Sequence, residues 1–429
     1  MPDSGKVDVI IFGATAFTGK CVVREFISLN ENKYSWAIAG RNENKLREVL
    51  EWASVKSGHD VTKIPIIICS CEDAASLNKM ARRGRVIINC CGPYRLYGEP
   101  VVKACIENGT HHVDVTAEPE YMESIQLYYH KAAEKNGSYI ISACAFESVC
   151  CDLGVIHVVN NFPGEVNSVE SFLKVRGVWN AEPAGNIGTW QSIVYAVANE
   201  QNMIRIRKRL HSSLNEPKLE PRLKSRFVVH RCELFNKKFA VPLPEPDQSV
   251  VFRTQMFLRN YYKQRPVQYK AYFVCPSLIF IIGFFLMGFF LYVFCKFDFG
   301  RHLLLKYPEF FSFGIFSSKG PSEEAIVKSS VCFKFIVRGW TKEIASKFEN
   351  KEEINVPTNK VLVAEMYCKN FGYGFTSKAA VNGAFTILKE SDKMPSRGGV
   401  YTPGGAFSRT SYFDQLLKDG ASFKILRET

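Results

Sequence analysis

The sequence predicts an α/β protein in which a doubly wound parallel sheet is followed by a second, α+β domain that carries an apolar membrane-associating segment. Three observations support this prediction. Strand-like and helix-like segments alternate over the first 145 residues, a glycine-spaced turn follows the first strand, and residues 271–295 hold no charge in 25 positions. Alternating strands and helices are typical of parallel sheets, because each helical crossover returns the chain to the same end of the sheet. We therefore expect a dinucleotide-binding domain over residues 1–150.

Six strands are expected in this first domain, each followed by a helix or a turn. The expected strands are Val7–Phe12, Ser35–Ala39, Ile64–Cys69, Val86–Cys90, His112–Val115 and Tyr139–Cys144. Helical spacing of apolar residues predicts helices over Thr18–Leu29, 41–56, Asp73–Arg83, 98–110 and Glu120–Asn136. Ligands of such sheets bind at the carboxyl ends of the strands.

Residues 151–370 form the expected second domain, of a substrate or dimerisation type. "VNSVESFLKVRG" alternates as a strand and "GTWQSIVYAVANEQNMIRIRKRL" has helical spacing. The stretch Arg205–Arg231 holds nine Lys or Arg against two Glu and is interpreted as a solvated loop, or alternatively as a face held against anionic lipid. "SSVCFKFIVRGW" and "NKVLVAEMYC" are expected strands.

Residues 371–429 are expected to return to the first domain. "TSKAAVNGAFTILKES" predicts a helix, "GGVYTPGGAF" a glycine-rich loop and "SYFDQLLKDG" a short terminal helix.

The apolar segment 271–295 predicts contact with a membrane. As one helix it would be about 37 Å long, against a hydrocarbon core of about 30 Å. Both flanks are basic, so the positive-inside rule selects no orientation. We expect the segment to dip into one leaflet or a lipid-droplet monolayer with both ends cytosolic. A helix buried in the fold, in a homodimer or in a substrate lid is the alternative.

Composition limits the classes of partner and compartment. A net charge of +13 favours an anionic partner, such as a phosphate cofactor or an acidic membrane. Nucleic acid is not expected, because neither zinc-finger spacing nor a ribonucleoprotein aromatic motif occurs. Fourteen cysteines without a Cys-x-x-Cys motif indicate buried thiols in a reducing compartment, with Cys90 or Cys91 as a nucleophile the alternative. No apolar leader precedes the first strand, which predicts the cytosolic side.

The turn "GATAFTG" predicts a site for the phosphates of a dinucleotide. Gly13 permits a tight turn, Gly19 allows close packing of helix on sheet, and Ala16 takes the position that faces the pyrophosphate. The free N–H groups of the following helix favour an anion. The expected cofactor contacts in this turn are Gly13, Ala14, Thr15, Ala16, Phe17, Thr18 and Gly19.

Two further strand ends add cofactor contacts. Arg41 ends the second strand where NAD-selective sites carry an acidic residue, so NADP(H) is favoured over NAD(H); an ordinary surface arginine is the alternative. Cys91, Gly92 and Pro93 follow the fourth strand and are expected beside the nicotinamide.

Catalytic residues are less strongly indicated than the cofactor contacts. Tyr94 and Tyr97 follow the Gly-Pro turn and are the candidate proton donors. The pair His111 and His112 lacks further ligands in reach, so no metal site is predicted. The pair Tyr292 and Lys296 has dehydrogenase-like spacing, but it lies in the apolar segment and is interpreted as a coincidence.

Four segments resemble the saccharopine dehydrogenase-like oxidoreductases: "VIIFGATAFTGK", "AIAGRNENKL", "NCCGPYRLYGEPVVKACIENGTHHVDVTAE" and "GGVYTPGGAFSRTS". The resemblance implies a Rossmann-type domain, an inserted α+β domain and nicotinamide-dependent chemistry on an unidentified substrate. The family turn is usually G-x-x-G-x-x-G, from which Ala16 departs. Pro93-Tyr94 and Asp152-Leu153-Gly154 stand where the true reductases have Pro-Tyr and Asp-Pro-Gly.

The family is also similar to trans-acting enoyl reductases of lipid synthesis, and the resemblance implies association with lipid droplets or membranes. The expected function is therefore an NADP-dependent oxidoreductase of lipid metabolism on the cytosolic face of a droplet or of a mitochondrial or endoplasmic-reticulum membrane. A non-catalytic scaffold that retains the Rossmann fold is the alternative.

Overall fold

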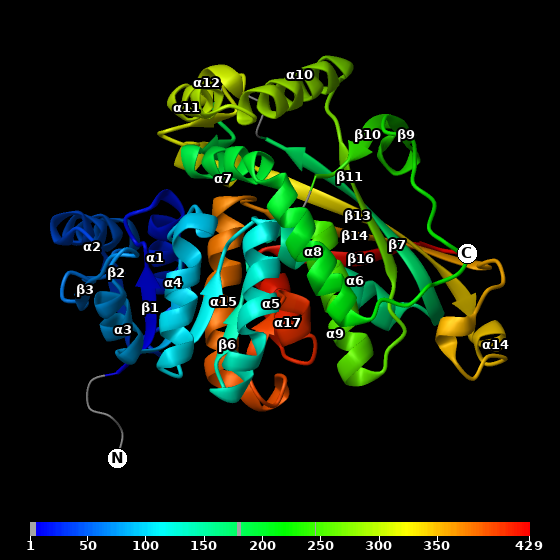
Figure 1. The fold of residues 1–429 in the computed structure, drawn as a ribbon, viewed down its shortest axis with the longest axis horizontal. Coiled ribbons are helices and arrows are strands. Elements are labelled where there is room, and N and C mark those ends of the chain that lie inside the picture. Colours follow the sequence, from blue (N-terminus) through cyan, green and yellow to red (C-terminus); the bar gives the residue numbers. More distant parts are fainter. Residues whose placement is uncertain (1–5, 178–181, 245) are drawn as a thin grey trace.

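The computed structural model describes residues 6–177, 182–244 and 246–429. Two seven-stranded sheets dominate the chain, and helix α6 (Phe146–Asn161) connects them. Figure 1 shows the first sheet with its helices on one side of the molecule and the strands of the second sheet on the other. The predicted doubly wound sheet and the second α+β domain are thereby confirmed.

The first sheet is parallel throughout. In spatial order its strands are β15 (Gly399–Tyr401), β6 (Tyr139–Ile141), β5 (His111–Asp114), β4 (Gly84–Asn89), β1 (Val7–Phe12), β2 (Trp36–Gly40) and β3 (Ile66–Ile68). The crossover helices are α1 (Phe17–Asn30), α2 (Glu43–Ser57), α3 (Ala74–Arg82), α4 (Tyr94–Glu107) and α5 (Pro119–Lys135). Strand order reverses between β1 and β4, which places the switch point of the sheet beside the turn after β1.

The seventh strand corrects the expectation of six. Residues of "GGVYTPGGAF" form β15 and the short helix α16 (Pro403–Phe407) instead of a loop. Three residues, the first of them a glycine, carry too little periodicity to signal a strand, and β15 is held by parallel pairing with the distant β6. Helix α15 (Tyr373–Glu390) packs on α1 and β4 of the first sheet.

The second sheet is mixed. Its strands, in spatial order, are β16 (Ala421–Glu428), β14 (Lys360–Lys369), β13 (Ser330–Thr341), β7 (Gly164–Arg176), β11 (Gln268–Val274), β10 (Lys238–Pro242) and β9 (His230–Cys232). Only β7 and β11 pair in parallel among the described strands of this sheet. The strand β16 pairs with β14, so this part of 371–429 belongs to the second sheet and not to the first.

The remaining helices belong to the second domain and the chain end. They are α7 (Ile187–Ala198), α8 (Glu200–Leu214), α9 (Asp247–Tyr262), α10 (Leu278–Cys295), α11 (Asp298–Lys306), α12 (Pro308–Phe311), α13 (Glu323–Lys328), α14 (Lys342–Ala345) and α17 (Tyr412–Lys418). A two-stranded sheet pairs β8 (Gly185–Asn186) with β12 (Phe316–Ser317).

Two sequence expectations for this domain need correction. The apolar run 271–295 is not one helix: its first residues complete the buried strand β11, and α10 begins only at Leu278. The basic stretch is a loop only after Leu214, because Arg205–Leu214 continues α8. Two of its arginines turn inward as ion pairs, Arg207 to Glu123 and Arg226 to Glu170, each with a nitrogen–oxygen distance of 2.6 Å.

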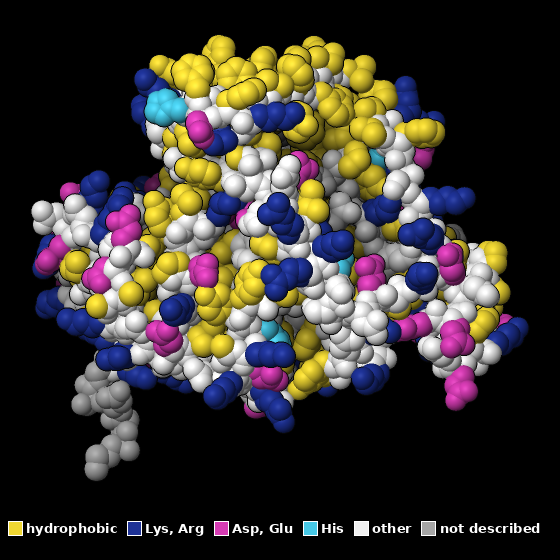
Figure 2. Space-filling model, in the orientation of Figure 1, with side chains coloured by type: hydrophobic (Ala, Val, Ile, Leu, Met, Phe, Trp, Pro, Cys, Tyr) yellow, Lys and Arg dark blue, Asp and Glu magenta, His cyan; other side chains and the backbone are white. Residues whose placement is uncertain are grey.

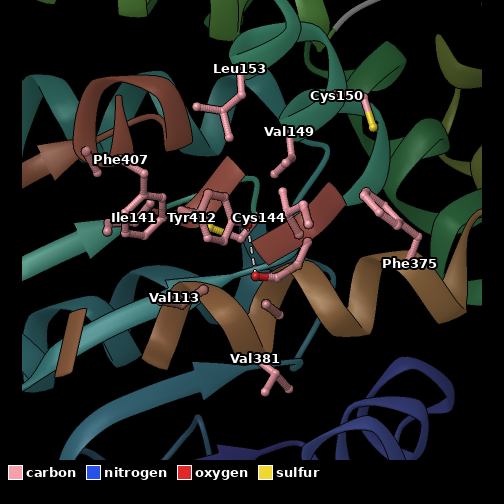
Figure 3. Close-up of a cluster of buried hydrophobic side chains, with 14 of the residues drawn as sticks. Val113, Ile141, Cys144, Val149, Cys150, Leu153, Phe375, Val381, Phe407 and Tyr412 are labelled. Carbon is pink, nitrogen blue, oxygen red and sulfur yellow. Dashed lines mark hydrogen bonds between the residues drawn. The ribbon is translucent and has the colours of Figure 1, made fainter. Parts of the chain in front are cut away.

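The largest core joins the two domains. Apolar side chains of β5, β6, α6 and α15 pack together with those of α16 and α17 (Figure 3). The Tyr412 hydroxyl donates a hydrogen bond of 2.9 Å to the Ala379 carbonyl within this cluster. Since a buried aromatic of this kind stabilises its surroundings by several kilocalories per mole, α17 is firmly attached to α15 and the first sheet.

Candidate cofactor site

The turn after β1 has the geometry that a dinucleotide phosphate requires. Gly13 has φ +77°, and a Cβ there would lie 3.0 Å from the Cys90 carbonyl carbon and the Cys91 nitrogen. A Cβ at Gly19 would lie 2.1 Å from the Gly13 carbonyl oxygen. Both positions therefore exclude a side chain, as the sequence spacing indicates.

Ala16 fits this turn without strain. It is the residue before α1, with φ −68° and ψ 157°, and its N–H donates a 2.9 Å hydrogen bond to the Gly13 carbonyl. Within the described chain no side chain caps this end of α1, so the first N–H groups of the helix remain available to an anion. Ala16 lines the pocket described next.

A pocket of about 270 Å³ opens where β1, β2, β3 and β4 end. Its lining comes from the turn after β1, the Gly-Arg end of β2, the loop after β3 and the Cys-Cys-Gly loop after β4: Phe12, Gly13, Thr15, Ala16, Gly40, Arg41, Cys69, Ser70, Cys71, Glu72, Cys90, Cys91, Gly92 and Tyr97. Arg41 is exposed and offers a guanidinium to a phosphate. The glycine cradle, the uncapped helix and this cation together fit a phosphorylated dinucleotide.

Several predicted contacts lie outside the lining. Ala14 is fully buried, and Phe17 stacks edge-on against Tyr373 with ring centroids 4.5 Å apart. Thr18 and Gly19 belong to the first turn of α1, and the buried Pro93 precedes α4. These residues shape the turn and its packing against α15, whereas Gly13, Thr15, Ala16, Arg41, Cys91 and Gly92 face the pocket.

The two candidate proton donors are in different environments. The Tyr94 hydroxyl is buried and donates a 2.8 Å hydrogen bond to the Asn89 carbonyl, and burial raises its pKa well above the ordinary value. This geometry argues against a role in proton transfer. Tyr97 is half-buried and lines the pocket. Of the two, only Tyr97 is placed to give a proton to a bound molecule.

Glu118 joins the pocket to the second domain. Its carboxylate accepts hydrogen bonds from the backbone N–H groups of Tyr94, at 2.9 Å, and Arg95, at 2.8 Å, which begin α4. It also accepts one of 2.6 Å from the Ser192 hydroxyl on α7. The carboxylate therefore caps α4 and ties it to α7, which positions the helix that carries Tyr97.

The other polar residues at the strand ends are structural. Asp114 is fully buried and accepts hydrogen bonds from Ser142 and from the Ala143 and Thr116 N–H groups, while burial raises its pKa to about 6. Burial lowers the pKa of His112 to about 3. Tyr292 lies on α10 and Lys296 directly follows that helix, with the ammonium 4.0 Å from the ring centroid, and neither residue lines the pocket. The described residues hold no group of three metal-ligating side chains.

Sequence reasoning missed the loop after β3. Cys69, Ser70, Cys71 and Glu72 line the pocket although none was predicted to contact the cofactor. The sequence could have predicted these contacts, because this loop follows a parallel strand and the carboxyl ends of parallel strands share one edge of the sheet.

A larger cavity of about 440 Å³ lies in the second domain. Arg265 in its lining is already hydrogen-bonded to Val166, Asn167 and Lys351.

The strand order, the glycine turn and the pocket define a dinucleotide-binding α/β protein with a second sheet domain. Residues 9–141 match the family described as the saccharopine dehydrogenase NADP binding domain. The human "Saccharopine dehydrogenase-like oxidoreductase" is 37% identical over 428 residues, covering 97% of each chain. The "Lipid droplet localized protein" of Caenorhabditis elegans is 35% identical over 435 residues, covering 99% of each.

A solved structure shows the same fold. The apo saccharopine dehydrogenase (L-Glu forming) of Saccharomyces cerevisiae aligns with a TM-score of 0.54 at 12% identity, over 98% of this chain and all of that one. The chain belongs to the saccharopine dehydrogenase-like oxidoreductase family. Its first domain is an NADP-binding domain of that type, which supports NADP(H) as the cofactor.

Proposed function

We propose that this protein is an NADP(H)-dependent oxidoreductase that works at a lipid surface on a lipid-like or amphipathic substrate. The observation that carries the proposal is an apolar cap, formed by the outer faces of α10, α11 and α12, on the same compact body as the cofactor pocket. Figure 2 shows hydrophobic side chains gathered over these helices. A soluble monomer rarely exposes a contiguous apolar surface of this kind.

The cap is strongly exposed on its outer side. Ile279 is 82% exposed and Phe310 77% exposed. The other large exposed side chains of the cap are Leu278, Ile282, Phe285, Leu286, Phe289, Tyr292, Phe297, Phe299, Tyr307 and Phe313. The exposed Lys296 and Lys306 are suited to anionic headgroups. Such a surface is stable in water only when it is covered, and a lipid layer covers it without a second protein.

The way α10 is attached to the rest of the protein favours a helix that lies on a lipid surface over one that spans a membrane. α10 has 18 residues, or about 27 Å, and is the one helix of the described chain that is long and apolar enough to span a membrane. Its inner face packs on α7 through Leu291 and Cys295, and the strand β11 precedes it directly. After α12 the chain returns to pair β12 with β8. Both ends of α10 are thus fixed to one side of the body, which supports a helix lying in the interface.

The cap and the pocket are mechanically connected. Trp190 and Val194 of α7 pack beneath α10, and Ser192 of the same helix bonds to Glu118, which caps α4. A molecule drawn from lipid past α7 would therefore arrive near the start of α4 and Tyr97. This arrangement favours a substrate with a long apolar part.

Bound NADP(H) supplies a hydride donor or acceptor. The glycine turn and Arg41 would orient it, and Arg41 would bind the additional phosphate, which favours NADP(H) over NAD(H). Tyr97 is placed to hold or release the proton that accompanies hydride transfer.

The second candidate function is a non-catalytic scaffold at a lipid surface. It is favoured by Ala16, whose methyl occupies a position where a dinucleotide turn carries glycine, and by the Tyr94 hydroxyl, which is already bonded to backbone. Such a protein would dock on lipid without turning over a nicotinamide cofactor.

The deciding experiment measures NADPH consumption by the full-length protein on droplets that contain long-chain enones or aldehydes. The proposal predicts substrate-dependent oxidation of NADPH that is lost in Arg41→Glu and in Tyr97→Phe. Val55→Glu, a change of an exposed residue on α2, serves as the matched control and should leave the rate unchanged. Docking on droplets without NADPH binding would establish the scaffold instead.

A further inference from the structure

Two cysteines differ from the other twelve. All fourteen thiols are free, and twelve are buried, whereas Cys71 and Cys91 are half-exposed. These two also line the cofactor pocket, where each thiol shifts the pKa of the other. The two thiols that solvent can reach are therefore the two that share this pocket, although they come from the separate loops after β3 and β4.

The scaffold holds both thiols in place. The Cys91 N–H donates a 3.0 Å hydrogen bond to the Asn89 side chain, and its Sγ lies 3.0 Å from where a Cβ at Gly13 would be. On the other side, the Asp73 N–H donates to the Ser70 carbonyl at 3.1 Å, and the Asp73 side chain caps α3. The fold therefore fixes the loops that carry both thiols, and Cys91 lies against the dinucleotide turn.

We propose that Cys71 and Cys91 form a reversible disulfide under peroxide, and that this disulfide and bound NADP(H) exclude each other. The proposal rests on the proposed function in one respect, because it takes this pocket as the NADP(H) site. It adds a site of thiol modification and a regulation of that site by an oxidant.

The electrostatics give the two thiols different roles. The Cys91 side chain lowers the pKa of Cys71 against the effect of burial, and the Arg41 guanidinium lowers it further. The pKa of Cys91 is raised, first by the Cys71 side chain and then by burial. Since the thiolate is the nucleophile, Cys71 attacks the oxidant and Cys91 resolves the product.

The oxidation balances in two steps. The Cys71 thiolate attacks one oxygen of hydrogen peroxide, an S–O bond forms, the O–O bond breaks, and hydroxide leaves as water after taking a proton. The Cys91 sulfur then attacks the Cys71 sulfur, an S–S bond forms, and the S–O bond breaks with release of a second water that carries the Cys91 proton. The two thiols lose two electrons in all, which reduce the peroxide. A small thiol such as glutathione reverses the reaction.

Closing this bond changes the pocket. A disulfide brings the two sulfurs to about 2.05 Å and fixes the loop after β3 to the loop after β4. Both loops line the same space of about 270 Å³, so the bridge stands across the region that the nucleotide must enter. Because linkage is reciprocal, NADP(H) in the pocket must protect the thiols to the same degree that the disulfide weakens NADP(H) binding.

A second pair of neighbouring cysteines serves as a control for the effect of exposure on oxidation. The Sγ atoms of Cys150 and Cys368 lie 3.5 Å apart, but both thiols are buried. If closeness alone decided oxidation, this pair would also form a disulfide. We expect it to remain reduced, because peroxide reaches only the pair in the pocket.

The test treats the full-length protein with hydrogen peroxide, with and without NADPH, and maps disulfides by peptide mass spectrometry. We expect a Cys71–Cys91 bridge in wild type, at least tenfold slower formation with saturating NADPH, and at least tenfold weaker NADPH binding after oxidation, restored by dithiothreitol. Dimedone should label Cys71 in Cys91→Ser and should not label Cys91 in Cys71→Ser.

Two results would overturn the inference: no bridge between these cysteines without NADPH, or a bridge that leaves NADPH affinity unchanged. A protein that forms the bridge but never binds NADPH, even when reduced, would refute the proposed cofactor function and the mutual exclusion, while the mass spectra would still establish the disulfide.

Discussion

Phe289 offers a quantitative test of the lipid-docking cap. It lies on α10 and is 60% exposed. A phenylalanine side chain has roughly 200 Å² of apolar surface, so about 120 Å² is available to lipid. At about 25 cal/mol per Å², its transfer into an acyl layer contributes about 3 kcal/mol. Phe289→Asp removes this contribution and should weaken binding to lipid by about a hundredfold.

Flotation of the purified protein with phospholipid-coated triolein droplets and with bilayer vesicles measures this change. Val55→Asp is the matched control, because Val55 is 84% exposed but lies on α2 in the first domain. It should float like wild type, and Phe289→Leu should lose less than tenfold. Equal flotation of Phe289→Asp and wild type would refute the assignment of the cap as the lipid-binding surface. Binding to droplets only would identify a monolayer as the natural surface.

Three further changes test the site and the fold. Arg41→Glu should weaken NADPH binding tenfold to a hundredfold, the loss of a charge-assisted contact of about 1.5–3 kcal/mol, with NADH binding changed far less; equal losses in calorimetry would contradict the role of Arg41. Gly19→Ala places a Cβ 2.1 Å from the Gly13 carbonyl oxygen and should destabilise the first domain by about 1–3 kcal/mol in urea unfolding, so an unchanged midpoint would refute the close packing. Burial raises the pKa of Asp152 to about 7 from 3.8, so the folded protein holds a proton that the unfolded chain releases, and stability falls as pH rises between these values. Asp152→Asn should flatten this slope, and an unchanged slope between about pH 4 and about pH 7 would contradict it.

Most of the first domain could be predicted from the sequence. Its strands are buried β-branched runs bounded by turns, and "VDVII" or "RVIIN" has a strong local signal. β15 and the division of residues 271–295 could not be predicted. β15 exists because β6 offers it an edge, and β11 belongs to the second sheet because β7 and β10 lie on either side of it. Pairing between distant segments decides both, and no local pattern records it.

In the candidate site, too, features with a local cause could be predicted from the sequence and features that depend on distant contacts could not. Gly13, Gly19 and Arg41 were predicted because each has a local reason, namely a tight turn, a close approach or a charge at a strand end. Cys71 was missed, since its proximity to Cys91 depends on how the loops after β3 and β4 converge. Tyr94 was misjudged as equivalent to Tyr97, because the sequence does not show which of two tyrosines on one helix turns toward the backbone of β4.

Calorimetric titration of NADPH and NADH into the full-length wild-type protein, with Ala16→Gly beside it, tests the central claim most directly. The account predicts that wild type binds NADPH, that NADH binds more weakly, and that Ala16→Gly changes the NADPH affinity by less than tenfold, because the turn accommodates the methyl without strain. Binding of neither nucleotide to wild type, with binding restored in Ala16→Gly, would contradict it and would show that the Ala16 methyl closes the site.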